Sequence, residues 1–415
     1  MKHTITNVLV LLFTAANIFA QAGISKTNPN TTNIPIPFLN QQLNLDIDGK
    51  AAGDQSGISV SLSADGTRIA VGANVNNAGY VSLYDWDGST WVQIGSDIDG
   101  EAIGDQSGYA VSLSADGTRI AIGASGNDGN GTNSGHVRLY DWNDSKWVQI
   151  GGDIDGEAAG DQSGYAVSLS AQGTRVAIGS RGNSSNTGHV RLFDWDGLAW
   201  SQTGIDIDGE TEGDWSGYSV SLSADGTRVA IGSILNSSNT GHVRLYDWNG
   251  SAWLQTGLNI NGEAKDDASG WSVSLSSDGA RVAIGAVFNA SNEISSGHVR
   301  LYDWDGSAWL QVGEDINGEA TGDWSGFSVS LSASGTRVAI GALLNDGDSD
   351  NTGHVRLYDW NGSVWSQTGK DIDGEAADDY SGSSVSLSAD GTHLAIGAAG
   401  NDGNGSSAGH VRIFQ

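Results

Sequence analysis

Carboxylates are concentrated in short, glycine-containing segments that recur along the chain. Residues 97–105 read Asp-Ile-Asp-Gly-Glu-Ala-Ile-Gly-Asp, and residues 153–161 repeat this pattern almost unchanged. Carboxylate oxygens at this spacing are the hard donors that Ca²⁺ prefers, and glycine permits the tight turns of a metal-binding loop. The candidate Ca²⁺ ligands are Asp97, Asp99, Glu101, Asp105, Asp153, Asp155, Glu157 and Asp161.

A second interpretation of these acidic segments needs no metal. Asp side chains form Asx turns and accept hydrogen bonds from nearby backbone N–H groups, which is common where a chain reverses direction. In the first copy Lys50 replaces the glutamate, and a later copy has Asn259 and Asn261 in place of aspartates. These replacements still suit a turn but weaken a calcium site, so both interpretations remain open.

Aromatic side chains gather where the acidic segments end, around a recurring Ser-Gly dipeptide. The residue before Ser-Gly varies from copy to copy, and Trp271 and Phe327 stand directly after it. Aromatic rings on variable loops are typical of stacking platforms for sugar rings, although they also pack between structural units. The candidate ligand-binding residues are Trp215, Trp271, Trp324, Phe327 and Tyr380.

Other chemically capable residues recur too regularly to mark one catalytic site. Trp-x-x-x-x-Trp pairs such as Trp142 with Trp147 predict cross-strand packing. Repeated arginines such as Arg119 are expected to form ion pairs with nearby carboxylates. His393 stands where the other copies have arginine. Because a catalytic site occupies one place, recurrence at one repeat position indicates architecture, and no catalytic residue stands out. The six histidines that follow a glycine are His136, His189, His242, His298, His354 and His410, with Tyr80 in the first copy.

A repeat of about 54 residues positions all of these groups. Ser-Gly followed by Val-Ser-Leu-Ser recurs seven times, and self-similarity at this period is typical of propellers and solenoids. One copy contains four predicted strands, at residues 109–114, 118–124, 135–142 and 147–154, with an Asp-Gly hairpin turn at 116–117. The Ser-Gly dipeptides begin at Ser56, Ser107, Ser163, Ser216, Ser269, Ser325 and Ser381.

The two ends of the repeat region are complementary. The last copy ends at Gln415 after its third strand, while residues 40–49 line up with the fourth strand at 91–100. The N-terminal strand can therefore complete the last unit and close a ring, which removes open sheet edges. We predict an all-β, seven-bladed propeller over residues 34–415, with four antiparallel strands per blade.

Composition excludes several classes of protein. The chain has no cysteine, so disulfides and thiolate chemistry are absent, and its formal net charge of −30 disfavours binding to nucleic acid. Its 61 glycines fall mainly at fixed repeat positions and its 15 tryptophans can build a core, so disorder is not expected.

The N-terminus has the pattern of an export signal. A basic start at residues 1–3 precedes an apolar run and a small residue, Ala20, so a signal peptide is predicted at 1–20 and a flexible leader at 21–33. The apolar run is too short for a membrane span, and no other segment is longer. The expectation is a secreted or periplasmic protein, monomeric and without a transmembrane segment.

The repeat resembles a known family. Ser107-Gly108, Val111-Ser-Leu-Ser, Ile122-Gly-Ala and Gly135-His-Val-Arg-Leu-Tyr are similar to the FG-GAP repeat, which builds the propeller of integrin α-subunits and many secreted bacterial proteins. The family's Phe-Gly is Ser-Gly here. Its calcium loop between the first two strands is shortened to Ala-Asp-Gly-Thr, so the family's calcium sites do not transfer to that hairpin.

Two functions follow from the resemblance and the loops. The first is a secreted or cell-surface binding or adhesion propeller that recognises carbohydrate, or another extracellular glycan or protein ligand, through the face bearing the variable loops. The alternative is an extracellular polysaccharide-degrading enzyme, a lyase or glycoside hydrolase. A hydrolase needs two carboxylates about 5–9.5 Å apart. No such pair breaks the repeat, so binding is favoured.

Overall fold

The computed structural model describes Leu39 and residues 41–75, 77–347 and 349–415. These residues belong to one compact unit, Ile36–Gln415. The predicted signal peptide and leader lie outside the described residues. Within the described part of the chain, no helix is long and apolar enough to cross a membrane.

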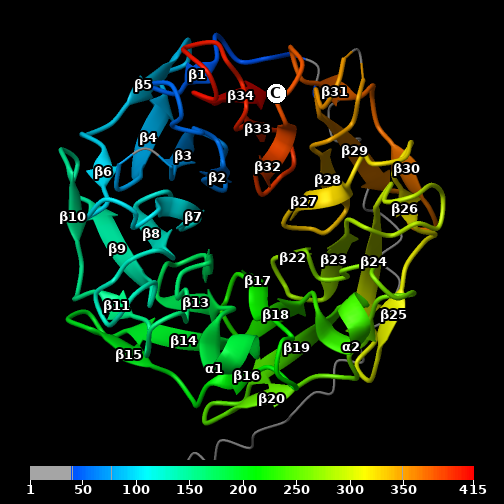
Figure 1. Cartoon of the computed structure of the whole chain (residues 1–415), viewed down its shortest axis with the longest axis horizontal. Helices are drawn as coiled ribbons and strands as arrows, with labels where there is room; N and C mark the ends of the chain where they lie inside the picture. Colours follow the sequence, from blue (N-terminus) through cyan, green and yellow to red (C-terminus); the bar gives the residue numbers. More distant parts are fainter. Residues whose placement is uncertain (1–38, 40, 76, 348) are drawn as a thin grey trace, which may run out of the picture. The chain divides into compact units, whose positions relative to one another are not determined.

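Seven antiparallel sheets surround a central axis, each with its first strand nearest that axis (Figure 1). We number the sheets as blades 1–7 in chain order, and the strands of each blade 1–4 from the inside outward. Strand 1 is β2 (Ser59–Leu62), β7 (Ser107–Leu113), β12 (Ala166–Leu169), β17 (Ser216–Leu222), β22 (Ser272–Leu275), β27 (Ser325–Leu331) and β32 (Ser381–Leu387). Strand 2 is β3 (Arg68–Ala73), β8 (Arg119–Ala124), β13 (Arg175–Ser180), β18 (Arg228–Ser233), β23 (Arg281–Ala286), β28 (Arg337–Ala342) and β33 (Leu394–Ala398).

The outer half of each blade follows the same order. Strand 3 is β4 (Tyr80–Trp86), β9 (His136–Trp142), β14 (His189–Trp195), β19 (His242–Trp248), β24 (His298–Trp304), β29 (His354–Trp360) and β34 (His410–Phe414). Strand 4 is β5 (Trp91–Gln93) with β6 (Ile98–Asp99), β10 (Trp147–Gln149) with β11 (Ile154–Asp155), β15 (Trp200–Gln202) with β16 (Ile207–Asp208), β20 (Trp253–Gln255) with β21 (Ile260–Asn261), β25 (Trp309–Gln311) with β26 (Ile316–Asn317), β30 (Trp365–Gln367) with β31 (Ile372–Asp373), and β1 (Ile47–Asp48) in blade 7.

The outermost strand differs from the prediction in one respect, because it is split in two. β10 and β11 both pair with β9, and residues 151–153 between them leave the ladder. Gly151 in this gap has φ +71°, and a Cβ there would meet the ring of Trp200 in the next blade at 2.9 Å. Glycine therefore allows the break and lets the neighbouring blade pack close to it.

The hydrophobic core is divided into layers between adjacent blades. One layer joins Val81 and Leu83 of blade 1 to Ile120 and Ile122 of blade 2. Strand 2 is buried on both faces, which explains its nearly continuous apolar sequence. At Gly123 an added Cβ would lie 2.0 Å from the carbonyl oxygen of Gly164 in the next blade, so close blade packing requires glycine there.

The predicted ring closure is confirmed. β1 pairs with β34 through Ile47 opposite Val411, and the backbone N–H of Leu43 donates to the carbonyl of Ile413 at 2.7 Å. Figure 1 shows blue β1 beside red β34. The N-terminal strand therefore supplies the outer strand of the last blade.

Candidate functional site

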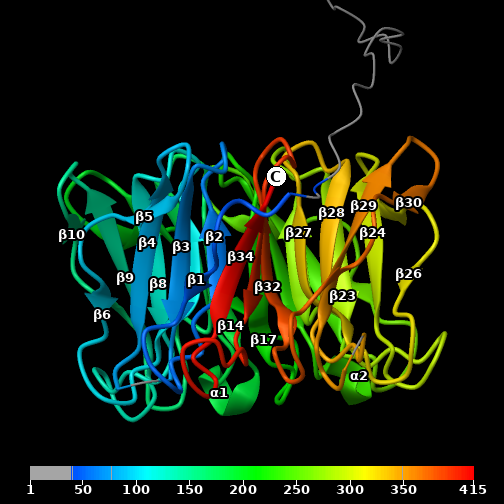
Figure 2. The ribbon, with the colours of Figure 1, turned by 90° about the horizontal axis from the view of Figure 1, so that it is seen from above.

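The variable loops lie on one face of the propeller. They are the loops between strands 2 and 3 and the connections from strand 4 of one blade to strand 1 of the next. Two of them contain short helical turns, α1 (Asn183–Asn186) and α2 (Asn236–Asn239), which lie at the same end of the propeller in Figure 2. The other face carries the short, uniform hairpin turns.

The residue before Ser-Gly has left-handed backbone geometry in every blade. A positive φ costs a non-glycine residue on the order of 1 kcal/mol, so seven such residues show a conformation imposed by the repeat. The backbone conformation at this position is constant while the residue type varies, so each blade presents a different side chain on the loop-bearing face. The residues are Gln55, Gln106, Gln162, Trp215, Ala268, Trp324 and Tyr380, with φ between 54° and 58°.

A cavity of about 600 Å³ opens on this face beside the loops of blades 4 and 5. Trp215, Trp271 and Phe288 supply its aromatic walls. Ala268, which also lines the cavity, stands where the other six blades have Gln, Trp or Tyr, and its small side chain leaves the space open. This size and this predominantly apolar lining are typical of small-molecule sites. The remaining lining residues are Ile234, Leu235, Asn239, Lys265, Asp266, Ala290, Ile294 and Ser295.

An arc of five rings extends from this cavity around the mouth of the central channel. Successive ring centroids lie 4.7, 5.1, 5.0 and 5.6 Å apart, which is contact distance for aromatic pairs. Trp271 belongs to both the arc and the cavity wall, so the two surfaces are continuous. The arc consists of Tyr109, Tyr165, Tyr218, Trp271 and Phe327, one from each of blades 2–6.

Arg181 places a cation at this aromatic surface. Its guanidinium carbon lies 3.8 Å from the centre of the Tyr165 ring and 4.7 Å from that of Trp215, and its Nε donates to Gln162 at 2.8 Å. No carboxylate pairs with it among the described residues, unlike most other arginines here. A guanidinium held over rings and lacking a carboxylate partner can receive an anionic group of a ligand.

The five predicted ligand-binding residues take three different places. Trp215 and Trp271 line the cavity. Trp324 and Phe327 contact Trp271, with ring centroids 6.3 and 5.6 Å away, and so support its wall. Tyr380 lies beside Gly400, where an added Cβ would meet its ring at 2.5 Å.

Sequence reasoning missed Arg181 and Phe288. Both stand in variable loops between strands 2 and 3, where alignment of the copies is weakest. A signal for Arg181 was available, because twelve of the thirteen arginines fall at two repeated strand positions and Arg181 alone does not.

The acidic connections mainly organise their own backbone. Asp105 accepts hydrogen bonds from the backbone N–H groups of Glu101 and Ala102, at 3.1 and 2.9 Å, and Asp161 does the same in the next blade. Asp97 bonds to Lys50. This is the turn chemistry that the sequence suggested, and calcium binding by these connections stays a prediction.

The structure distributes the eight predicted metal ligands over several environments. Glu101 and Asp153 meet at His136, and Glu157 meets His189 together with Asp206, which was not among the predicted ligands. Asp99 and Asp155 extend from β6 and β11 with exposed side chains. The metal-compatible groups therefore form across neighbouring blades rather than within one acidic segment.

The tryptophan pairs and arginines are structural, as their recurrence predicts. Trp142 and Trp147 face each other across β9 and β10 with ring centroids 5.4 Å apart. Arg119 bonds to Asp141 through Nε at 2.6 Å and Nη2 at 2.8 Å. His393, with a pKa lowered by burial, lies near Asp390 and Asp65 beside the hairpin turns, away from the cavity.

These features define a seven-bladed β-propeller with an aromatic cavity on its loop-bearing face. The family model described as the FG-GAP repeat matches residues 97–140 and 365–414. These two segments therefore match the FG-GAP repeat, as the sequence predicts.

Comparison with curated proteins gives no match. A solved chain of Kuenenia stuttgartiensis hydrazine synthase is similar to 86% of this chain over 96% of its own length, with 13% identity and a TM-score of 0.57. A likeness at this level shows the fold alone.

Proposed function

We propose that this propeller is an extracellular binding protein that holds a glycan in the cavity beside blades 4 and 5. The observation that carries the proposal is the placement of Trp215, Trp271 and Phe288 around about 600 Å³ of open space on the variable face. Flat rings offer stacking surfaces to the apolar faces of sugars, and the rigid blades fix those rings in advance.

The charge beside the cavity supports an acidic glycan as the ligand. Arg181 lies against Trp215, and Lys265 lines the cavity with its ammonium 3.5 Å from Asp266. Both cations lie at the aromatic surface of a protein with a formal net charge of −30. A sugar stacked on Trp215 would bring a carboxylate or sulfate substituent within reach of the Arg181 guanidinium.

Binding without catalysis is the function that the cavity lining favours. Among the described residues that line it, Asp266 is the one carboxylate. Glycoside hydrolysis by the usual route requires an acid and a second carboxylate on either side of the bond. The degradative alternative is therefore the weaker of the two proposals.

Export is part of the proposal. The pattern of residues 1–20 supports a cleaved signal peptide, and FG-GAP repeats are typical of extracellular proteins. A mature protein that begins at Gln21 and appears in the culture medium or periplasm is the expected result of N-terminal sequencing.

A glycan array followed by calorimetry tests the binding function. We expect wild-type protein to bind acidic glycans and Trp215→Ala to lower the affinity about tenfold or more, because buried aromatic contacts dominate such sites. Leu198→Ala is the control, since this exposed side chain lies in a uniform turn on the opposite face. Arg181→Gln is expected to weaken acidic glycans and leave neutral ones unchanged.

Three results would contradict the proposal. A blank array, or affinity that is unchanged in both Trp215→Ala and Trp271→Ala, would remove the glycan site. Accumulation of shortened or unsaturated products during incubation with the wild-type protein would instead favour the enzyme.

A further inference from the structure

A cluster of three metal-compatible side chains lies at the junction of blades 4 and 5, and none of the three lines the cavity. His298 begins β24, Glu263 comes from the connection that leaves blade 4, and Asp315 stands in the gap between β25 and β26. The Nδ1 atom of His298 lies 3.9 Å from Oε2 of Glu263 and 3.7 Å from Oδ2 of Asp315. These separations exceed hydrogen-bond length.

Other side chains contact one oxygen of each carboxylate, and the two carboxylates also lie within hydrogen-bond reach of each other. Arg300 approaches Oε1 of Glu263 at 3.7 Å, and Gln311 donates to Oδ1 of Asp315 at 2.6 Å. The remaining oxygens, Oε2 and Oδ2, both face the imidazole of His298. Contacts that orient ligands in this way are typical of metal sites.

The imidazole itself is fully buried and unsatisfied. His298 is 0% exposed, and its Nδ1, which points at the two carboxylates, has no hydrogen-bond partner in the described structure. A cation placed between this buried, unpaired nitrogen and the two carboxylate oxygens would give all three a partner.

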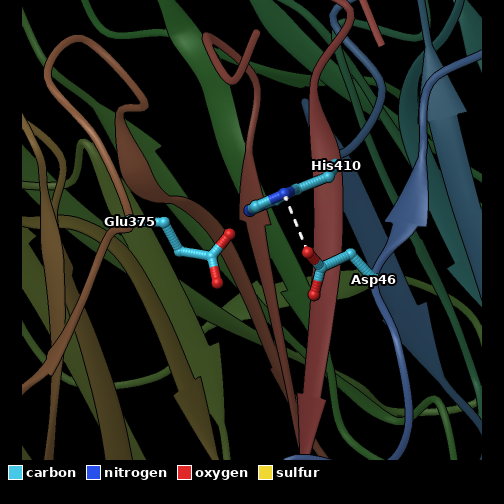
Figure 3. Close-up of side chains that lie close together, drawn as sticks. All are labelled: Asp46, Glu375 and His410. Atoms are coloured by element: carbon cyan, nitrogen blue, oxygen red, sulfur yellow. Dashed lines mark ion pairs between the residues drawn. The ribbon is translucent and has the colours of Figure 1, made fainter. Parts of the chain in front are cut away.

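The same three residue types meet in four other blades. Figure 3 shows the group in blade 7, where His410 lies 3.7 Å from Asp46 of the closing strand, with Glu375 on the other side of the ring. In each group the glutamate comes from the connection that precedes the blade. The groups are Glu101, His136 and Asp153; Glu157, His189 and Asp206; Glu319, His354 and Asp371; and Asp46, Glu375 and His410.

The two remaining blades show what replaces a cation. In blade 1 the histidine is Tyr80 and the glutamate is Lys50, whose ammonium bonds to Asp97 at the corresponding place. In blade 4 the aspartate is Asn259, whose amide nitrogen donates to Oε2 of Glu210 at 3.0 Å. A positively charged or hydrogen-bond-donating group thus meets the carboxylate wherever the set of three is incomplete.

We propose that the five complete groups bind divalent transition-metal ions of the zinc type, one ion at each of five blade junctions. One imidazole and two carboxylates are donors that suit Zn²⁺, leaving a fourth position for water. Ligand atoms on a tetrahedral Zn²⁺ lie about 3.4 Å apart, so small rotations of the flexible carboxylates complete the shell. Each ion would fasten an incoming connection to strands 3 and 4, a role that disulfides cannot play in this cysteine-free chain.

Zinc stoichiometry in single-site variants of the whole mature protein tests this proposal. Equilibrium dialysis against Zn²⁺ with metal analysis is expected to give about five ions per chain. Asn259→Asp, which completes the set in blade 4, should raise the number to about six. Asp315→Asn, which copies the natural blade 4 set into blade 5, should lower it to about four.

Tyr80→Phe is the matched control. Blade 1 already contains the Lys50 ammonium, so this variant should bind the same number of Zn²⁺ ions as the wild-type protein. Zn²⁺ should also raise the Tm in a manner reversed by EDTA and not reproduced by Ca²⁺, since binding to the folded state alone stabilises it. Failure to retain Zn²⁺, a stoichiometry insensitive to both Asn259→Asp and Asp315→Asn, or displacement of Zn²⁺ by a modest excess of Ca²⁺ would overturn the proposal. The last two results indicate general attraction to an acidic surface.

Discussion

Arg175 on β13 binds Asp194 on β14 through two parallel hydrogen bonds, from Nε at 2.5 Å and from Nη2 at 2.6 Å. The same guanidinium lies 5.5 Å from the ring centre of Trp248 in the next blade, and its Nη1 donates to the carbonyl of Gly226 in that blade's hairpin turn at 2.8 Å. One side chain therefore joins two strands of its own blade to the tryptophan pair and turn of its neighbour. The pairing with aspartate recurs at Arg68, Arg119, Arg228, Arg281 and Arg337.

Removal of this arginine should loosen one blade junction. In Arg175→Met the chain keeps an apolar side chain but loses the paired charge, the hydrogen bond to Gly226 and the stacking on Trp248. We expect the free energy of unfolding in urea to fall by about 2 kcal/mol. Lys146→Met, at an exposed turn position, is the control and should change it by less than about 0.5 kcal/mol. Equal stability of the two variants would contradict a structural role for the arginine.

Blade 7 lacks this arginine–aspartate pair, so the pair can be introduced there by two substitutions. His393 takes the arginine position, and Gln415 takes the position of the aspartate on strand 3. His393→Arg alone lacks the strand 3 aspartate that pairs with this arginine in the other six blades, so it should stabilise the protein less than the double variant. Combined with Gln415→Asp, it should show a favourable coupling of about 1 kcal/mol in a double-mutant cycle measured by urea unfolding. A coupling near zero would mean that the paired geometry depends on the other blades.

The pH dependence of stability should contain a contribution from His393. Burial lowers its pKa in the folded protein, and Asp390 and Asp65 only partly oppose this effect. Below about pH 6.5 the unfolded chain therefore binds a proton that the folded chain does not, so stability falls as the pH falls. The stability advantage of wild type over His393→Gln should shrink between pH 8 and pH 5 in urea titrations. An advantage that stays constant or grows would contradict the lowered pKa.

The closing strand should be essential for the stability of the ring. A chain that begins at residue 49 loses Leu43 and Ile47, which pack with Val411 in the core between blades 7 and 1. It also exposes the backbone edge of β34. We expect a loss of about 5 kcal/mol or more in the free energy of unfolding, whereas a chain that begins at residue 34 should match the mature protein. Similar melting curves for the two truncated chains would contradict closure by this strand.

Features inside one repeat could be predicted because they recur at fixed spacing. Seven copies fixed the number of blades, the Asp-Gly turns and the facing of Trp142 and Trp147. The surplus outer strand at residues 40–49 revealed the closure. The break in strand 4 was harder to predict. The sequence 147–154 alternates like one strand, whereas Gly151 and the Trp200 ring of the next blade impose a break.

The cavity and the histidine clusters depended on contacts between blades. The sequence marked Trp215 and Trp271 as variable aromatics, but Ala268 opens a space only because neighbouring blades hold those rings on either side of it. Arg181 meets Trp215 from a different blade. The distance between residues of different blades varies with the length of the loops that carry them, so no repeat pattern in the sequence encodes such contacts.

By itself, the sequence determined a closed ring of seven four-stranded units, because hydrophobic alternation and turn residues act over a few neighbouring positions and repeat with each copy. Only the tertiary structure decided which copies contribute to one site. Glu263 and His298 belong to different copies and reach the same place because the blades pack at a distance set by their glycines and core side chains. That packing builds the aromatic cavity beside blades 4 and 5 and, among the residues that the structure describes, five separate groups of metal-compatible side chains.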